Sequence, residues 1–112
     1  MNTLSNRVYD TFAKSWALVT AGELGHFNTM TVSWGGIGEI WGKPVAFLFI
    51  RPQRYTHEFT EAGNVFTLSW FAESMREKLA FCGAKSGRNV DKVKECGLTP
   101  LDDGDGAQYF AE

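Results

Sequence analysis

The chain has 112 residues, of which 44% are hydrophobic and 14% aromatic, and its formal net charge is −2 at pH 7. This length and apolar content are typical of one globular domain with its own core. The lack of a basic excess argues against nucleic acid and anionic membranes as partners. The sequence has no apolar run near the roughly 20 residues that cross a membrane and starts without a secretion signal, which favours the cytoplasm.

The start of the chain predicts one short helix and then a strand. Ser5 or Asn6 can cap a helix whose apolar positions follow helical spacing, at Tyr9, Phe12 and Trp16. Residues 17–21 (ALVTA) then have the composition of a strand.

Residues 28–34 (NTMTVSW) alternate strictly, as an extended strand with two different faces does. The face expected to lie on the core carries Met30, Val32 and Trp34. The opposite face carries a row of hydroxyls, those of Thr29, Thr31 and Ser33.

The next stretch is rich in glycine and predicts a bend or a short bulged strand near residues 35–42. Val45 to Ile50 is an unbroken apolar run, which predicts a strand buried on both faces. A helix is expected from a Thr56 cap to Ala62, and residues 65–71 (VFTLSWF) predict another strand.

The last part of the chain predicts two helices and a terminal strand. Ser74 and Glu77 have the spacing of a capping box, so a helix is expected until Gly83. A shorter helix is expected between an Asn89 cap and Gly97. The DGDG turn at residues 103–106 then leads into a strand over residues 107–110.

This order of elements predicts a mainly β fold with inserted short helices, a β-barrel rather than a doubly wound sheet. The glycines of residues 35–42 do not have the spacing of a dinucleotide fingerprint or a phosphate loop. Cys82 and Cys96 have no CxxC spacing and no nearby histidine pair, so both are expected to be reduced packing thiols. His26 and His57 are expected at the surface.

Four segments in order carry a resemblance: FNTMTVSWGGIG (27–38), GKPVAFLFIRPQRYT (42–56), FTLSWF (66–71) and CGAKSGRNVDKVKECGL (82–98). Over about residues 16–110 the chain resembles the flavin reductase-like, FMN-binding split-barrel family, and most of all its flavoredoxin-type members. The resemblance implies a split β-barrel that forms a homodimer and binds FMN without a covalent bond near the subunit interface. It also implies electron transfer between flavin and NADH, NADPH or a redox protein.

FMN needs hydrogen-bond donors along its ring edge, an apolar surface for the ring, and cations or backbone amides at its phosphate. For the ring and the ribityl chain, the resemblance points to Asn28, Thr29, Met30, Thr31, Val32 and Ser33, and Trp34 and Tyr55 are candidates for the ring surface. For the phosphate, the candidates are Arg51, Arg54 and Thr56, and then Lys85, Ser86, Gly87 and Arg88 of the AKSGR loop.

Each of these residues also has an ordinary interpretation. Threonines are common in strands, single cations are common on surfaces, and Trp34, Trp41 and Tyr55 can serve the core or a dimer interface.

The resemblance leaves the activity open between an NAD(P)H-dependent flavin reductase or flavoredoxin-like protein, a non-catalytic FMN carrier, and a remnant that only dimerises. Members of the family continue beyond the end of this chain with further strands, and about five strand candidates are counted here. A missing strand leaves an exposed edge that tends to pair. A fragment, a natural short form and a binding-defective remnant are all compatible with this length.

Overall fold

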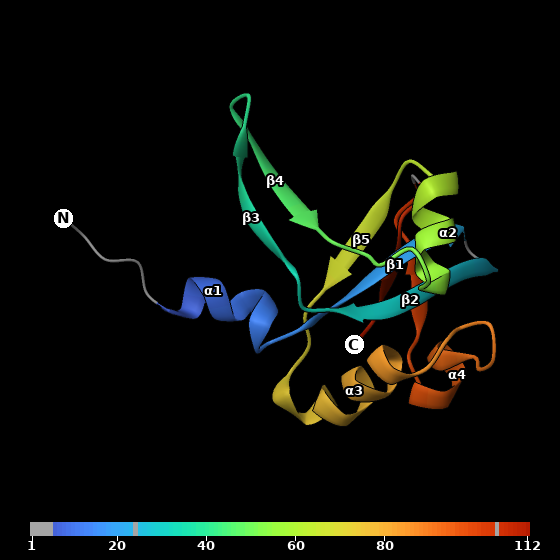
Figure 1. The fold of residues 1–112 in the computed structure, drawn as a ribbon. Helices are drawn as coiled ribbons and strands as arrows, with labels where there is room; N and C mark the ends of the chain where they lie inside the picture. Colours follow the sequence, from blue (N-terminus) through green and yellow to red (C-terminus); the bar gives the residue numbers. More distant parts are fainter. Residues whose placement is uncertain (1–5, 24, 105) are drawn as a thin grey trace.

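The computed structural model describes residues 6–23, 25–104 and 106–112 (Figure 1). About a third of the chain is helical and about a third is strand, so the helices take a larger share than a mainly β fold implies. The elements are, in chain order, α1 (Asn6–Ala13), β1 (Ala17–Glu23), β2 (His26–Val32), β3 (Gly35–Ile40), β4 (Lys43–Leu48), α2 (Tyr55–Ala62), β5 (Phe66–Ser69), the 3-10 turn η1 (Glu73–Met75), α3 (Arg76–Ala84), α4 (Lys92–Cys96), β6 (Pro100–Asp102) and β7 (Gln108–Phe110).

The centre of the molecule is an antiparallel sheet in the order β2-β1-β5. Val19 in the middle strand pairs with Met30 on one side and Leu68 on the other. Five consecutive residues of β1, Ala17 to Ala21, are buried, because both faces of this strand are covered. The strands expected around residues 17, 28 and 65 are therefore confirmed.

Two apolar clusters lie against this sheet. One joins Leu18 to α3, α4 and β7 through the buried residues Leu79, Cys82, Cys96, Leu98 and Phe110. The other joins β1 to α1 and β2 through Phe12, Ala17, Val19, Met30 and Val32. Figure 1 shows α3 and α4 together below the sheet, with α2 beside its edge.

The two faces predicted for residues 28–34 are only partly confirmed. Met30 and Val32 are buried in the core, but the Trp34 side chain is 57% exposed because it lies beyond the end of β2. Thr29 of the hydroxyl face is buried as well. Its Oγ1 lies 3.0 Å from the Thr20 Oγ1 and donates to the carbonyl of Val19 at 3.0 Å.

Strands β3 and β4 form a regular hairpin that projects from the body (Figure 1). Trp41 and Gly42 make its turn with φ values of 54° and 71°, the left-handed pair that a tight hairpin needs. The prediction of a strand buried on both faces over residues 45–50 is wrong, since Phe47 is 52% and Phe49 is 64% exposed. Within the described ranges these two strands pair only with each other.

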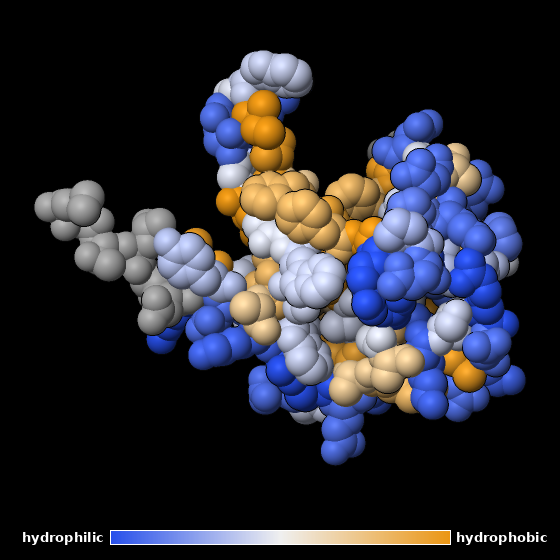
Figure 2. All heavy atoms as spheres, in the orientation of Figure 1, coloured by the Kyte–Doolittle hydropathy of each residue, from blue (hydrophilic) through white to orange (hydrophobic). Residues whose placement is uncertain are grey.

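Figure 2 shows apolar side chains along this hairpin and where it meets the body. The bulge expected over residues 35–42 is absent from the described hairpin, because all six residues of β3 pair in register with β4.

Three predicted helix caps differ from those observed. Arg54, without a side-chain bond, precedes α2, and Thr56 lies inside the helix, fully buried. The capping box at Ser74 does not form, because residues 73–75 make the tighter turn η1 and α3 begins after it. The cap of α4 is Asp91, whose carboxylate accepts from the Lys94 amide, rather than Asn89.

Two helices end directly before a glycine: Gly63 follows α2, and Gly97 follows α4. Gly97 ends α4 with a φ of 66°, as predicted. Gly83 lies inside α3, where a Cβ atom would come within 3.2 Å of the Thr31 Cβ. Its role is therefore close packing of α3 on β2 rather than termination. Near the start, Ser5 lies outside the described residues, and Trp16 lies beyond the end of α1.

The chain ends in the hairpin β6–β7, of which only β7 was expected. The described strands form three small sheets and no closed barrel. Of the helices in residues 6–23, 25–104 and 106–112, none has the length and apolar character that crossing a membrane requires.

The packing around β1 leads to a stability prediction. Leu18→Ala leaves a cavity between the sheet and α3 and should lower the free energy of unfolding by about 2–5 kcal/mol. Val8→Ala, at an exposed position of α1 outside the hairpin, should change it by less than about 0.5 kcal/mol. Urea unfolding followed by circular dichroism measures both, and similar losses in the two variants would contradict the assignment of the core.

Candidate functional site

Strand β2 and the residues that follow it line two adjacent hollows. The smaller, here called the arginine groove, has a volume of about 190 Å³ and is lined by Met30, Thr31, Val32, Ser33, Trp34, Phe49, Arg51 and Arg54. The larger, here called the Asn28 pocket, has a volume of about 640 Å³ and is lined by Gly25, His26, Phe27, Asn28, Thr29, Tyr55, Phe59, Gly87, Arg88, Asn89, Val90, Asp91, Lys92, Val93 and Pro100.

The arginine groove carries two guanidinium groups, both from the loop between β4 and α2. The Arg51 guanidinium lies 6.0 Å from the centroid of the Trp34 ring, and Nη2 of Arg54 donates to the carbonyl of Cys82 at 3.4 Å. Burial lowers the pKa of Arg54, and the nearby charge of Arg51 lowers it further. None of the ion pairs found among the described residues includes either arginine.

Two positive groups that repel each other beside no carboxylate favour an anionic ligand. The groove also has polar and apolar walls. Oγ1 of Thr31 donates to the carbonyl of Leu79, which fixes the position of its hydroxyl. Ser33 is half-buried, and Phe49 and Trp34 are exposed aromatic rings at the rim. The groove therefore combines cations, hydroxyls and aromatic surface in one place.

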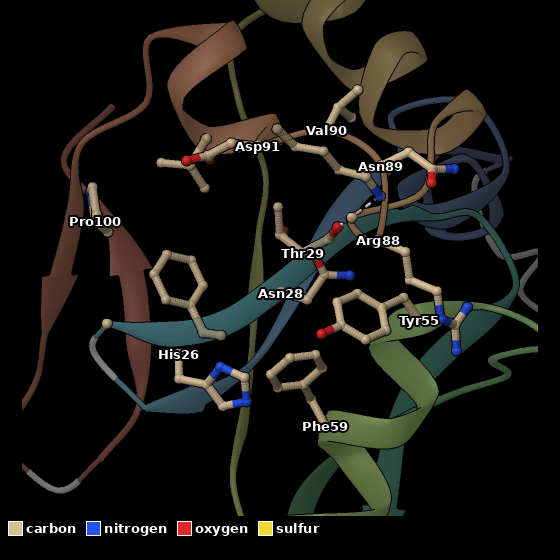
Figure 3. A pocket seen from close by; sticks show the side chains of 15 residues that line it. His26, Asn28, Thr29, Tyr55, Phe59, Arg88, Asn89, Val90, Asp91 and Pro100 are labelled. Carbon is tan, nitrogen blue, oxygen red and sulfur yellow. Dashed lines mark hydrogen bonds between the residues drawn. The ribbon is translucent and has the colours of Figure 1, made fainter.

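The Asn28 pocket forms where the AKSGR loop meets β2. Nδ2 of Asn28 donates to Oγ1 of Thr56 at 2.8 Å, which ties β2 to α2. A Cβ atom on Gly87 would lie 1.9 Å from Oδ1 of Asn28, so only glycine allows this loop to approach so closely. Figure 3 shows the Asn28 side chain beside the ring of Tyr55, with the ring of Phe59 next to it.

Arg88 is the exposed cation of this pocket, and its charge is already compensated. Its guanidinium lies 4.7 Å from the centroid of the Tyr55 ring, and Nη2 lies 2.7 Å from Oε1 of Glu58. Both charged side chains are partly exposed, so this ion pair contributes about 0–1 kcal/mol and is easily exchanged for another anion.

The structure separates the predicted site residues into groups. Thr31, Ser33, Trp34, Arg51 and Arg54 come together in the arginine groove, with the neighbouring Met30 and Val32. Asn28, Thr29, Tyr55, Gly87 and Arg88 come together in the Asn28 pocket.

Three candidates line neither hollow. Thr56 is buried behind Asn28, and Lys85 is exposed at the end of α3. The Ser86 hydroxyl accepts a bond from the Arg88 amide at 3.2 Å, which shapes the loop.

Sequence reasoning missed Lys92, which is the most unusual group near the site. Its side chain is 3% exposed, and Nζ donates to the carbonyls of Thr29 and Cys82 at 2.9 Å each. Burial, with a smaller effect from the charge of Arg54, lowers its pKa to about 8.

A signal for this lysine was available in the sequence. Lys92 lies four residues before Cys96 and thus on the same helix face as a residue expected to pack in the core. The charged composition of the KVKEC segment is typical of a solvent-exposed helix, so the burial of Lys92 was overlooked.

Lys92 makes stability depend on pH with a definite sign. Because its pKa falls from 10.5 to about 8 on folding, the unfolded chain binds more protons above pH 8. The free energy of unfolding should therefore rise by about 1 kcal/mol between pH 8 and 9. Cys82, whose pKa is raised from 9.0 to about 12, acts in the opposite direction from about pH 8 upward and offsets part of this rise.

Lys92→Met is the variant that isolates this effect. Urea unfolding of both proteins at pH 8 and 9 should show the rise in the wild type and its loss in the variant. Equal slopes with pH in the two proteins would show that Lys92 is not held as a buried charge.

Residues 9–112 match the family model described as the flavin reductase like domain. Among solved structures, the flavoredoxin of Desulfovibrio vulgaris (Miyazaki F) is similar with a TM-score of 0.78 at 27% identity, covering 100% of this chain and 61% of that one. The flavoredoxin from Methanosarcina acetivorans gives a TM-score of 0.77 at 21% identity, covering 100% and 59%.

An FMN-binding domain of a flavin reductases-like enzyme from Shewanella baltica OS155 gives a TM-score of 0.75 at 16% identity, covering 97% of this chain and 58% of that one. The search of curated proteins found no match. The chain thus spans about three fifths of the length of the solved structures that it resembles. Together with the family match, which covers nearly the whole sequence, these likenesses show that the chain belongs to the flavin reductase like domain family.

Proposed function

We propose that this chain binds FMN, with the phosphate at Arg51 and Arg54 in the arginine groove. The observation that carries the proposal is that two guanidinium groups line one groove without a carboxylate partner in the described chain. A charge-assisted hydrogen bond contributes about 1.5–3 kcal/mol, so two such donors are enough to fix a phosphate group.

The residues of the groove fit the rest of FMN as well. Thr31 and Ser33 offer hydroxyls to a ribityl chain, and the exposed rings of Trp34 and Phe49 offer an apolar surface for the flavin ring. The groove alone is smaller than the roughly 300–1,000 Å³ of typical ligand pockets. It would therefore hold the phosphate and ribityl chain, while the ring lies on the aromatic rim.

The proposed activity is electron transfer of the flavin reductase or flavoredoxin type. FMN supplies the redox chemistry when bound, taking up electrons from NADH or NADPH and releasing them to free flavin, ferric iron or a redox protein. The role of this chain is to bind and orient the cofactor, so no side chain is assigned as acid, base or nucleophile.

A non-catalytic FMN carrier has the same groove but no nicotinamide site. Oxidation of NADH or NADPH in the presence of the chain and added FMN, followed at the nicotinamide absorbance band, separates the two functions. Turnover above the rate of free FMN supports the reductase, and its absence with FMN still bound supports the carrier.

Arg51→Ala and Arg54→Ala should each weaken FMN binding, by about 10–100-fold for the loss of one charge-assisted bond. Both arginines line the groove in which the phosphate is proposed to bind. Quenching of FMN fluorescence on titration measures the affinity.

Lys78→Ala is the matched control, because this substitution removes one positive charge from an exposed position of α3 that lines neither hollow. The affinity of this variant for FMN should equal that of the wild type. Unchanged affinity in both Arg51→Ala and Arg54→Ala would overturn the phosphate assignment.

We also propose that the chain forms a homodimer through the β3–β4 hairpin. This hairpin exposes Ile37, Ile40, Phe47 and Trp41, the last of which is 94% exposed. An exposed apolar hairpin of this size is typical of a surface that associates.

Ile40→Lys should shift the mass measured by light scattering from dimer to monomer. Val8→Lys, an equivalent change at an exposed residue of α1, should leave the dimer intact. A monomeric wild type would contradict this part of the proposal.

A further inference from the structure

The only two cysteines of the chain meet in the core. Cys82 lies in α3 and Cys96 is the last residue of α4, with exposed fractions of 0% and 5%. Their sulfur atoms lie 3.8 Å apart, and both thiols are free. The two residues are 14 positions apart in sequence, so this contact is made by the packing of α4 on α3.

We propose that Cys82 and Cys96 are a redox-active pair that a hydroperoxide closes to a disulfide between α3 and α4. The sulfur of Cys96 attacks one peroxide oxygen, the O–O bond breaks, and the thiol proton leaves with the released oxygen as water. The sulfur of Cys82 then attacks the Cys96 sulfenic acid, the S–S bond forms, the S–O bond breaks, and a second water leaves. Two thiols lose two electrons and two protons, and hydrogen peroxide is reduced to two waters.

The position of Cys96 makes closure possible without unfolding. The sulfur atoms have to approach by about 1.8 Å to reach the length of a disulfide bond. Cys96 ends its helix, and Gly97 follows it in the left-handed conformation with a φ of 66°. The backbone on this side of the pair can therefore adjust without disturbing a helix interior.

The surroundings of Cys82 favour its protonated thiol. Burial raises the pKa of Cys82 to about 12, and the neighbouring Cys96 adds to this effect. The charge of Lys92 acts in the opposite direction and favours the thiolate. Because the thiolate is the reactive form, we expect the pair to respond to accumulated peroxide rather than to act as a fast nucleophile.

Formation of the Cys82–Cys96 disulfide should change the geometry of the candidate site. The carbonyl of Cys82 accepts hydrogen bonds from Nζ of Lys92 at 2.9 Å and from Nη2 of Arg54 at 3.4 Å. Arg54 lines the arginine groove and Lys92 lines the Asn28 pocket. Movement of α4, which carries both Cys96 and Lys92, therefore changes how Lys92 and Arg54 share the Cys82 carbonyl. This consequence rests on the proposed function of the groove.

The test is to treat the folded chain with hydrogen peroxide, quench it in acid, and alkylate the remaining thiols under denaturing conditions. We expect the number of free thiols per chain to fall from two to zero, and the intact mass to decrease by two hydrogen atoms. A non-reducing gel should show no covalent dimer, and dithiothreitol should restore both thiols. With only two cysteines, this product has one possible connectivity. Cys96→Ser should give no such product.

Other outcomes overturn the proposal. These are two unreacted thiols, a mass gain from irreversible oxidation, a disulfide between two chains, or a lower urea midpoint for the oxidised chain than for the reduced one. The last outcome would show that the bond forms only in a distorted chain, whereas a native cross-link raises the midpoint.

The coupling to the groove is tested separately by FMN titration of the oxidised and reduced forms. A change in affinity of threefold or more supports it, and equal affinities overturn it. Failure of both forms to bind FMN overturns the proposed function but leaves the disulfide result standing.

Discussion

The buried amine of Lys92 is the contact on which the geometry of the site depends. By donating to the carbonyls of Thr29 and Cys82, it holds the start of α4 against both β2 and α3. It lies close enough to Arg54 for the two charges to affect each other, which places a third cation behind the groove. Taking such a group out of water costs free energy, and only its hydrogen bonds with backbone carbonyls offset that cost. Binding of an anion near these positive charges should therefore stabilise the folded chain.

The arginine groove results from two features of the chain that are unrelated in sequence. Strand β2 ends at Val32 and turns outward into the hairpin, which leaves Ser33 and Trp34 on the rim. The chain returns from β4 directly into the loop that carries both arginines. An FMN site built in this way rests on a rigid sheet on one side and on a short loop on the other. The exposed hairpin beside it is the surface through which we propose that a second copy of the chain packs.

The sequence predicted the central strands well, because Met30 and Val32 alternate with polar residues and β1 begins with the largely apolar run ALVTA. The prediction for Val45 to Ile50 was wrong, because an apolar run is equally compatible with a buried strand and with a strand whose apolar side chains are exposed in the single chain. The helix cap predicted at Ser74 was also wrong, because this residue lies inside the 3-10 turn η1. The candidate site residues were proposed from their chemistry and from the family resemblance. Lys92 was missed because the charged composition of KVKEC outweighed the four-residue spacing that places Lys92 on the helix face of Cys96.

The most direct measurement is the visible absorbance spectrum of the purified chain, recorded before and after incubation with FMN and removal of the excess by gel filtration. It tests cofactor binding without assuming an electron donor or acceptor. Our account predicts a two-banded flavin spectrum that elutes with the protein at a defined ratio of FMN to chain. A protein that remains colourless after reconstitution while its circular dichroism shows a folded chain would contradict the account, since the fold would then be present without the function.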